Sequence, residues 1–458
     1  MNILLIYPGL VEGFDSYARG ANWFNHGVGI LSAVARRENH SIHYIDCRRL
    51  KDWSAFESTV SRIPYDVAMI SIATVDFDAS KQMGAILKKA KPGIPIMVGG
   101  PHPTLMTSET ASVPEFDVIF THEAEVTLPG LLSHLRDAPR IVRGEMPQDL
   151  DAIPFVDRTL APEGETPYFR GLDRPYYSIT ASRGCLYHCT FCQPAERQVF
   201  GDRVRRRSVD NILDELETLA CDRGMKSFMI HDDCFTQYYD WVEEFCEKKN
   251  RRGLAQPFAC QTRADIVCRR PDLMETLKAA GLRWVLIGFE SGSDRILKFI
   301  KKGTTVAQNI EAGQICESLG IRIFANYMFG LPTETKTEME QTVEMIRRIN
   351  PAIHSPAIFT PTPGSDLYDY CVEHDLSLIT SSEGYRRNPG SGKKIKGVDY
   401  GFIDQCLKKA IRGSAKNWVY HNIVQKLITR GIISREFIFR LDPIGRIEWL
   451  KKQFTLRD

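Results

Sequence analysis

The sequence lacks a long hydrophobic run, a secretory leader and an excess of charge of either sign. No window of its 458 residues reaches the length that a helix needs to cross a bilayer. The first residues, MNILLIYPG, have neither a basic segment nor a cleavage site, so they predict a strand and not a signal peptide. With 59 Lys and Arg against 57 Asp and Glu, the net charge of +2 gives no electrostatic reason to expect a nucleic-acid partner.

The twelve cysteines do not indicate a disulfide scaffold. In a long chain without a leader, cysteines predict reduced thiols and a cytoplasmic location. Nine of them stand singly and are expected to be small buried hydrophobic residues: Cys47, Cys221, Cys234, Cys246, Cys260, Cys268, Cys316, Cys371 and Cys406. A composition of 43% hydrophobic and 25% charged residues is typical of a globular protein. Because 458 residues are too many for one ordinary core, two or three domains are expected.

Residues 1–138 alternate between strand and helix patterns. Apolar runs predict strands at 3–7, 41–46, 67–73, 94–100 and 117–122. Helical patterns lie between or after them, at 29–37, 79–90 and 126–135. This rhythm predicts a doubly wound α/β domain with the flavodoxin-like strand order, in which ligands bind beyond the carboxyl ends of the strands.

Residues 139–175 are rich in proline and break the periodicity, so they are expected to form a linker wrapped over a surface. The alternation resumes over residues 176–370, with strands expected at 176–182, 227–233, 257–263, 284–290, 322–330 and 354–360. Six strand–helix units are too few for a closed eight-stranded barrel. The pattern therefore predicts an open, partial (β/α)6 barrel with its chemistry at the carboxyl ends of the strands. Residues 371–458 predict a small, mainly helical region.

The segment 182–193, SRGCLYHCTFCQ, holds three cysteines spaced C-x3-C-x2-C. Cysteine thiolates are the usual ligands of an iron–sulfur cluster, one for each iron of a cubane. Three thiolates would leave one iron with an open position for a substrate or cofactor. A zinc site needs a fourth ligand, and His188, between two of the cysteines, is poorly placed to supply it. A chance grouping is the other alternative, and the pattern favours the cluster.

With Phe191 before its last cysteine, at the end of the first barrel strand, this motif resembles that of the radical S-adenosylmethionine (SAM) superfamily. Four further segments occur in the order seen in radical SAM enzymes that carry an N-terminal cobalamin-type domain: IHDDCFT (230–236), GFESGSDRILKFIKKGTT (288–305), MFGLPTET (328–335) and PTPGSDLYD (361–369). The resemblance covers about residues 1–370. It implies that Cys185, Cys189 and Cys192 bind a [4Fe–4S] cluster, whose open iron is chelated by SAM. It also implies that an electron from the reduced cluster cleaves SAM and yields a 5′-deoxyadenosyl radical.

The resemblance implies a SAM site at the strand ends next to the cluster, and Phe191 belongs to it. Asp232 and Asp233 end the second strand, where a carboxylate would accept hydrogen bonds from the SAM ammonium group. Whichever of the two points away is expected to cap a helix or turn. Arg263 ends the third strand and is expected either to pair with the SAM carboxylate or to form a structural salt bridge.

Two later strands complete the expected SAM site. Glu290 ends the fourth strand, and the resemblance implies that its carboxylate accepts the ribose hydroxyls. Gly330 and Glu334 follow the fifth strand and resemble the motif that flanks the adenine. The basic run RVRRR, at 203–207, is interpreted as a solvated turn before a helix and not as a binding patch.

The first domain resembles cobalamin-binding modules. Gly99 and Gly100, in the segment GGPHP, would let a large planar ligand or a nucleotide tail approach the backbone closely. Ser71 matches a serine that such modules often place two residues before a leucine, although Ala73 replaces that leucine here. The segment HEAE, at 122–125, lies where relatives commonly have Gly-Glu-Gly-Glu, and it is interpreted as a helix N-terminus.

His26 is a candidate cobalt ligand. Methyl-carrying cobalamin modules supply a histidine through the motif Asp-x-His-x-x-Gly, and this chain has FNHGVG at 24–29. The histidine and the last glycine match, but Phe24 replaces the aspartate that orients the imidazole. A loop histidine near the start of a helix is therefore the favoured interpretation, with cobalt ligation as the alternative.

The resemblance implies a radical SAM enzyme with bound cobalamin, most simply a C-methyltransferase that acts on an unactivated carbon of a small molecule or lipid. The alternatives are a ring-forming or rearranging enzyme with both cofactors, a radical SAM enzyme whose first domain has degenerated, and a non-enzymatic cluster or cobalamin carrier. An electron donor such as flavodoxin or ferredoxin is the expected partner. Several aromatic residues near the C-terminus are expected in a helical core and not in a lid or a membrane contact: Trp418, Tyr420, Phe437, Phe439 and Trp449.

Overall fold

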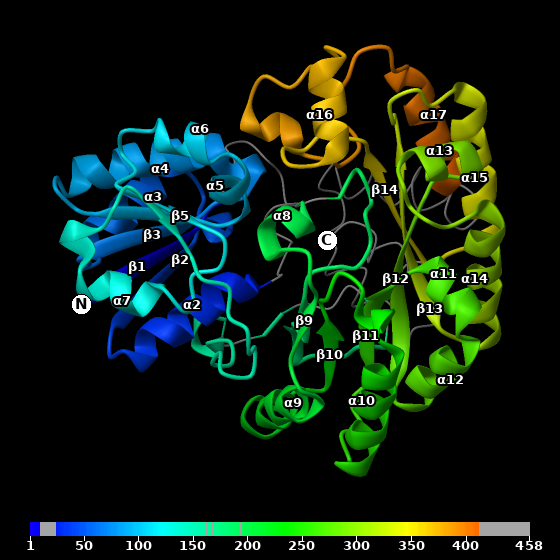
Figure 1. Ribbon diagram of the computed structural model, residues 1–458, viewed down its shortest axis with the longest axis horizontal. Helices are drawn as coiled ribbons and strands as arrows, with labels where there is room; N and C mark the ends of the chain where they lie inside the picture. Colours follow the sequence, from blue (N-terminus) through cyan, green and yellow to red (C-terminus); the bar gives the residue numbers. More distant parts are fainter. Residues whose placement is uncertain (10–23, 162–163, 166–168, 170, 193–194, 412–458) are drawn as a thin grey trace, which may run out of the picture.

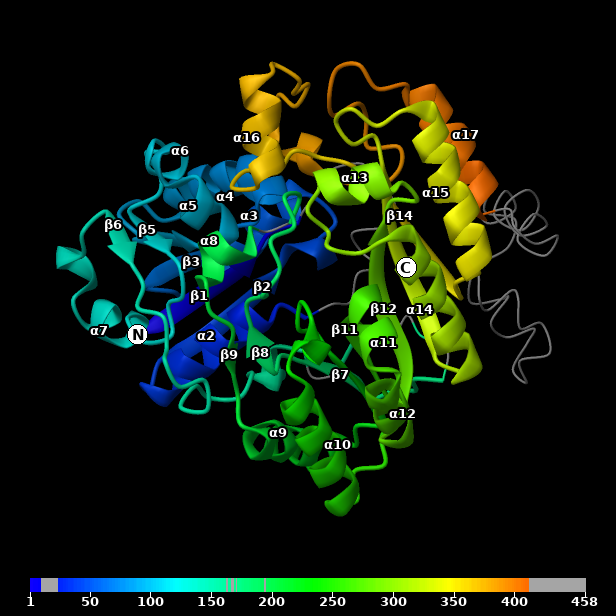
Figure 2. The same ribbon diagram turned by 45° about the vertical axis from the view of Figure 1, so that its right-hand side comes forward.

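The computed structural model describes residues 1–9, 24–161, 164–165, 169, 171–192 and 195–411. Two large parallel sheets lie side by side, one built by the N-terminal part of the chain and the other by its middle (Figures 1 and 2). Within the described ranges, no helix is both long and apolar enough to cross a membrane. The aromatic residues from Trp418 onward, for which a helical core was expected, lie outside the described residues.

The first sheet confirms the predicted flavodoxin-like order and adds a strand to it. Its order is β2-β1-β3-β4-β5-β6, and all neighbours are parallel. The strands are β1 (Asn2–Tyr7), β2 (Ser41–Asp46), β3 (Val67–Ser71), β4 (Ile96–Gly99), β5 (Val118–Thr121) and β6 (Ile141–Arg143). The segment expected to be only a linker thus begins with β6, which pairs with β5 and buries Val142 in the core of the first domain.

Helices cover both faces of the first sheet. They are α2 (His26–Arg37), α3 (Trp53–Arg62), α4 (Phe77–Ala90), α5 (Pro101–Leu105), α6 (Thr107–Ala111) and α7 (Leu128–Ser133). Phe56 of α3 and Met83 of α4 pack on one face, while Val28 of α2 and Leu132 of α7 pack on the other. Burial on both faces explains why the strands are nearly continuous apolar runs. The Asn25 side chain caps α2 by accepting from its first turn at 2.9 Å.

The second sheet is the predicted open (β/α)6 barrel. Its order, β14-β13-β12-β11-β10-β7, follows the chain, and all neighbours are parallel. The strands are β7 (Tyr176–Ile179), β10 (Ser227–Ile230), β11 (Phe258–Thr262), β12 (Leu282–Glu290), β13 (Arg322–Phe329) and β14 (Ile353–Ile358). A short antiparallel pair, β8 (Ser182–Arg183) and β9 (Arg205–Arg206), follows the first strand at the edge nearest the first domain (Figure 2).

Helices pack along the outer side of this sheet (Figure 1). The helices of this part of the chain are α8 (Glu196–Phe200), α9 (Val209–Arg223), α10 (Tyr239–Arg251), α11 (Ala264–Arg269), α12 (Pro271–Ala279), α13 (Asp294–Phe299), α14 (Val306–Ser318), α15 (Lys336–Ile349), α16 (Asp366–Glu373) and α17 (Tyr400–Ile411). Thr305 and Thr335 start α14 and α15 with capping boxes. Ile403 and Cys406 of α17 join the barrel core, so the described C-terminal region packs on the barrel.

The isolated cysteines divide by burial. Seven of the nine are buried, as expected for small hydrophobic side chains, and all twelve cysteines are free thiols. Cys268 is half-buried. Cys221 is exposed near the end of α9, so the expectation was wrong for this residue.

We expect Phe245→Ala to destabilise the barrel by about 3–5 kcal/mol, because it empties a close-packed aromatic site. Phe245 on α10 is 0% exposed, and its ring lies 5.5 Å from that of Phe235 and 6.0 Å from that of Phe258, centroid to centroid. The measurement is the midpoint of denaturant unfolding. Glu247→Ala, on the exposed side of the same helix, is the control and should change stability by less than about 0.5 kcal/mol. A wild-type midpoint for Phe245→Ala would contradict this packing.

Candidate active site between the two domains

The three clustered cysteines lie on one loop after β8. Cys185, Cys189 and Cys192 are all half-buried. The barrel anchors the loop through Thr190, whose N–H donates to the Ile300 carbonyl at 3.1 Å and whose carbonyl accepts from Leu367 at 2.9 Å. Burial raises the pKa of Cys185 to about 11 and also raises that of Cys192, so a neighbouring positive charge is needed to hold these thiolates. Iron supplies that charge when a cluster binds.

The donor set fits a cubane cluster better than a single ion. Among the residues that the structure describes, no three His, Cys, Asp or Glu side chains converge on one point that could hold a metal ion. A cubane needs no such convergence, because each cysteine binds a different iron. Three soft thiolate donors on one anchored loop therefore fit a [4Fe–4S] cluster with one iron left for another ligand.

The two aspartates after β10 have different surroundings. Asp232 is 1% exposed and accepts hydrogen bonds from the Ala181 N–H at 2.7 Å and from the Ser182 hydroxyl at 2.6 Å. Burial raises its pKa to about 7. Asp232 thus ties β10 to the start of the cluster loop, whereas Asp233 lines the cavity between the domains. Of the expected pair, Asp233 is the one placed to meet a bound ligand.

Glu196, which the sequence patterns did not single out, lies beside Asp233. It is the first residue of α8, is 6% exposed and lines the same cavity. Its Oε2 has no hydrogen-bond partner among the described residues. Burial and the nearby Asp233 carboxylate raise the pKa of Glu196 above its ordinary value. A lone acidic residue four positions after the last cysteine carries no recognisable motif, which explains why it was missed.

Glu290 lies close to the cluster loop in a buried ion pair. Its Oε1 accepts from the Lys302 Nζ at 2.9 Å, and both side chains are 8% exposed. The Lys302 Nζ lies 5.8 Å from the centroid of the Phe191 ring. Glu290 has a φ of +61°, and a Cβ on Gly288 would lie 2.1 Å from its Oε1. Gly288 therefore leaves the space that this pair occupies.

The last predicted SAM residues organise the loop after β13. The Glu334 Oε2 accepts from the Gly330 N–H at 2.7 Å and from the Leu331 N–H at 3.2 Å. Burial raises the Glu334 pKa to about 7. Gly330 has a φ of +81°, and a Cβ there would lie 3.1 Å from Ile403 of α17. Both residues thus shape the strand end, and a contact with adenine stays a prediction.

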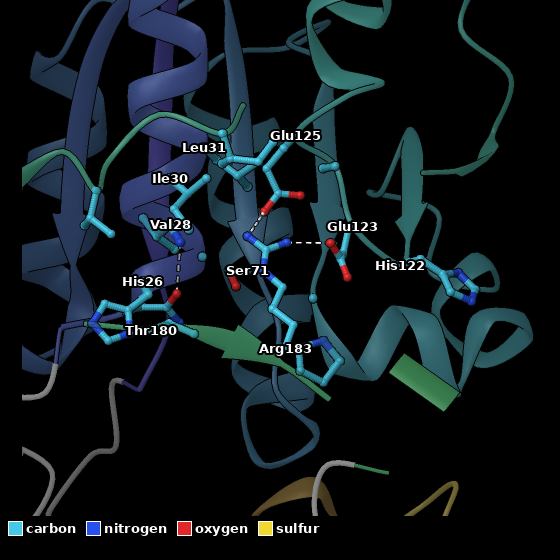
Figure 3. Close-up of a pocket in the computed structure, with 18 of the residues that line it drawn as sticks. His26, Val28, Ile30, Leu31, Ser71, His122, Glu123, Glu125, Thr180 and Arg183 are labelled. Carbon is cyan, nitrogen blue, oxygen red and sulfur yellow. Dashed lines mark hydrogen bonds and ion pairs between the residues drawn. The ribbon is translucent and has the colours of Figure 1, made fainter. Parts of the chain in front are cut away.

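A cavity of about 460 Å³ separates the two domains (Figure 3). The carboxyl ends of β1, β3, β4 and β5 line one side of it, and residues around the cluster loop line the other. Ser71, Gly99, Gly100 and His26, the candidate cobalamin residues, all border it. Gly100 has a φ of +104°, and a Cβ there would lie 2.9 Å from the Ile72 carbonyl, so only glycine fits. This bare backbone in a largely apolar wall fits a large planar ligand.

His26 connects the two domains. Its Nε2 lies 3.1 Å from the Ser178 carbonyl and 2.9 Å from the Ser178 hydroxyl, and its Nδ1 lies 3.0 Å from the Thr180 hydroxyl. Burial and the charge of Arg158 lower its pKa to about 3, so the ring is neutral. It is the first residue of α2, as the favoured interpretation expects. Because both ring nitrogens bind the barrel, neither points at an open coordination position.

A buried ion-pair group holds the same interface. Figure 3 shows the Arg183 guanidinium between Glu123 and Glu125, and its Nη2 lies 2.8 Å from the Glu125 Oε1. Arg205 also binds Glu123, with its Nη1 3.0 Å from Oε2. These four side chains are between 5% and 12% exposed. The interpretation of 203–207 as a solvated turn was therefore wrong for Arg205, whose acidic partner comes from a distant segment. It was also wrong for Arg207, which is 11% exposed and pairs with the buried Glu215 at 2.5 Å.

Comparison with known proteins identifies both domains. A family model described as the radical SAM superfamily matches residues 179–346, and a B12 binding domain model matches residues 18–132. An uncharacterised methyltransferase of Pyrococcus horikoshii is 26% identical over 429 residues, which cover 90% of this chain and 91% of that protein. An anaerobic magnesium-protoporphyrin IX monomethyl ester cyclase of Rubrivivax gelatinosus is 26% identical over 398 residues, covering 80% and 69%.

A solved structure shares the whole arrangement. The cobalamin-dependent S-adenosylmethionine radical enzyme OxsB, with aqua-cobalamin bound, superposes with a TM-score of 0.66 at 18% identity, covering 99% of this chain and 72% of that one. The two domains therefore define a class, the enzymes that join a B12-binding domain to a radical SAM barrel. This chain belongs to that family, and its cofactors are a [4Fe–4S] cluster, SAM and cobalamin.

Replacing any one of Cys185, Cys189 or Cys192 by alanine should reduce the iron and sulfide content from about four of each per chain to near zero, because the cluster loses a ligand. The fold should persist, since these side chains are half-buried in a loop. Cys221→Ala, which removes an exposed thiol on α9, is the matched control and should keep the full content. A wild-type iron content in Cys189→Ala would contradict the cluster assignment.

His26→Ala should leave the absorption spectrum of bound cobalamin unchanged and cost about 1–3 kcal/mol of unfolding free energy, because Ser178 on β7 and Thr180 just after it lose a hydrogen-bond partner. His134→Ala, at an exposed position of the same domain, should do neither. Spectra of the cobalt(II) form and thermal unfolding measure the two effects. Loss of a histidine nitrogen signal from the paramagnetic resonance spectrum of the variant would show that His26 ligates cobalt.

Proposed function

We propose that this enzyme transfers a methyl group to an unactivated carbon of a small molecule or lipid. The observation that carries the proposal is the shared cavity: Ser71 and Gly100 border it from the B12-binding domain, while Glu196 and Asp233 border it from the barrel. A substrate in this space would lie within reach of both cofactors. The relative from Pyrococcus horikoshii, which matches nearly end to end, carries the name of a methyltransferase.

When bound, the cluster and SAM supply a radical that removes a substrate hydrogen, and cobalamin supplies a methyl group. Cys185, Cys189 and Cys192 would hold the cluster, and Asp233 would accept hydrogen bonds from the SAM ammonium group. Glu290, oriented by Lys302, would accept hydrogen bonds from the ribose hydroxyls.

Apolar side chains make most of the remaining cavity wall. Met69 and Met97 come from the first sheet, Phe155 from the segment between the domains, and Val199 and Phe200 from α8. A mostly apolar space suits radical chemistry, because it offers reactive species few competing polar partners. It also suits an apolar substrate better than a highly charged one.

The expected electron donor is a flavodoxin or a ferredoxin. The cluster loop reaches the surface, where Leu186 is 46% exposed and His188 is also exposed. This patch, between two cluster cysteines, is a suitable docking point for a small redox protein.

Ring formation is the second candidate function, because a relative of similar identity is a cyclase. The two candidates differ in their products from SAM. Methyl transfer uses one SAM to supply the methyl group and another to make the radical, whereas ring formation uses only the second.

For methyl transfer we expect S-adenosylhomocysteine and 5′-deoxyadenosine in equal amounts for each methylated product. The measurement is quantitative mass spectrometry of anaerobic reactions that contain the substrate, a low-potential reductant and cobalamin. Cys189→Ala, which should make no deoxyadenosine, controls for background cleavage. Deoxyadenosine without matching S-adenosylhomocysteine, in a reaction that forms product, would reject methyl transfer in favour of ring formation or rearrangement.

A further inference from the structure

Arg263 lies where the barrel meets the cluster loop. It follows β11 and is 5% exposed. Its Nε donates to the Asp265 Oδ1 at 2.9 Å, and its Nη2 donates to the backbone carbonyl of Lys302. Its Nη1 donates to the Sγ of Cys189 at 3.8 Å. All three guanidinium nitrogens therefore have partners inside the protein.

An aromatic ring fixes the guanidinium from the loop side. The Arg263 Cζ lies 3.5 Å from the centroid of the Tyr187 ring, which stands between Cys185 and Cys189 in sequence. A planar guanidinium stacked on a ring and hydrogen-bonded at its edges has little freedom to turn. The expected pairing with a SAM carboxylate would require Arg263 to give up at least one of these contacts.

We propose that Arg263 is a positioning residue for the cluster that raises its reduction potential by donating to the Cys189 thiolate, and that it does not bind the SAM carboxylate. The inference rests on the cluster assignment made above. Reduction adds one negative charge to the cluster, so a buried cation beside it stabilises the reduced form more than the oxidised form. A hydrogen bond to a ligand sulfur acts in the same direction.

The role has a consequence for catalysis. Radical formation needs an electron from a soluble donor, and a cluster with too low a potential stays oxidised. By making the cluster easier to reduce, Arg263 would bring its potential closer to that of the donor. Its hydrogen bond to the Lys302 carbonyl also links the Cys189 side of the loop to the buried Glu290–Lys302 pair.

The test is a redox titration of the full-length, anaerobically reconstituted protein, followed by the paramagnetic signal of the reduced cluster. Arg263→Gln should shift the midpoint to a more negative potential. Arg263→Lys should give a smaller shift in the same direction, because lysine keeps the positive charge but lacks the planar guanidinium that donates to the Cys189 sulfur. The affinity for SAM, measured by equilibrium dialysis on the oxidised protein, should be unchanged in both variants.

Arg269→Gln is the matched control. Arg269 is 60% exposed and binds the same Asp265 at 3.3 Å, with no thiolate contact. Its removal should leave the midpoint where it is in the wild type. The control thus removes an arginine partner of Asp265 and leaves the hydrogen bond from Arg263 to the Cys189 sulfur in place.

Tyr187 provides a second route if Arg263→Gln fails to fold. Tyr187→Leu, in the half-buried loop, removes the ring under the guanidinium and should shift the midpoint negatively, whereas Tyr187→Phe should not. An unchanged midpoint in the folded Arg263 variants, or in Tyr187→Leu when they do not fold, overturns the inference. Weakened SAM binding with an unchanged midpoint would assign Arg263 to the SAM carboxylate. A wild-type protein that takes up no iron and sulfide would instead refute the cluster assignment itself.

Discussion

The buried contact of Arg183 with Glu123 and Glu125 fixes how the two domains meet. Arg183 stands two residues before Cys185, so the first domain holds the base of the cluster loop directly. A buried arginine without its carboxylates is strongly unfavourable, and so is a buried glutamate without its arginine. The two domains therefore cannot move apart without exposing these groups to water. His26, bound to Ser178 and Thr180, ties the first domain to the barrel at another point of the interface.

The way the two domains meet determines which groups line the cavity between them. The B12-binding domain contributes bare glycine backbone and aliphatic strand ends, while the barrel contributes Ser182 and Arg183, just before the cluster loop, and the Glu196–Asp233 pair. Polar groups that organise the site point into the protein: Asp232 holds β8, Glu334 holds the loop after β13, and Arg263 holds Cys189. The wall that a substrate would touch is left mostly apolar. Such a division suits chemistry that has to exclude water.

Local patterns predicted most of the fold and the cluster. The strand order of both sheets and the open barrel follow from apolar runs of ordinary length, and the cysteines lie within eight residues of each other. The three-residue β6 gives too short a signal to stand out from a proline-rich stretch. The burial of Arg205 could not be predicted either, because its partner Glu123 lies 82 positions away.

Partners that lie far apart in the sequence also explain which roles at the site could not be predicted. Nothing near Asp232 and Asp233 indicates which of them binds the backbone of another strand. His26 matches half of a cobalt-binding motif, yet its partner Ser178 lies 152 positions further along the chain. Glu196 matters only because folding places it beside Asp233. Roles in binding SAM and cobalamin therefore stay predictions for the individual residues, while the cluster loop is recognisable from its cysteine spacing together with Phe191 and the later barrel motifs.

The claim on which this account depends most is that both cofactors face one cavity. Paramagnetic resonance of a protein loaded with cobalt(II) cobalamin and reduced cluster tests it directly. If the two centres share the cavity, their spins should interact, and both signals should broaden relative to protein that holds only one centre. Two unbroadened signals that simply add, in protein shown to contain both cofactors in full amounts, would contradict it.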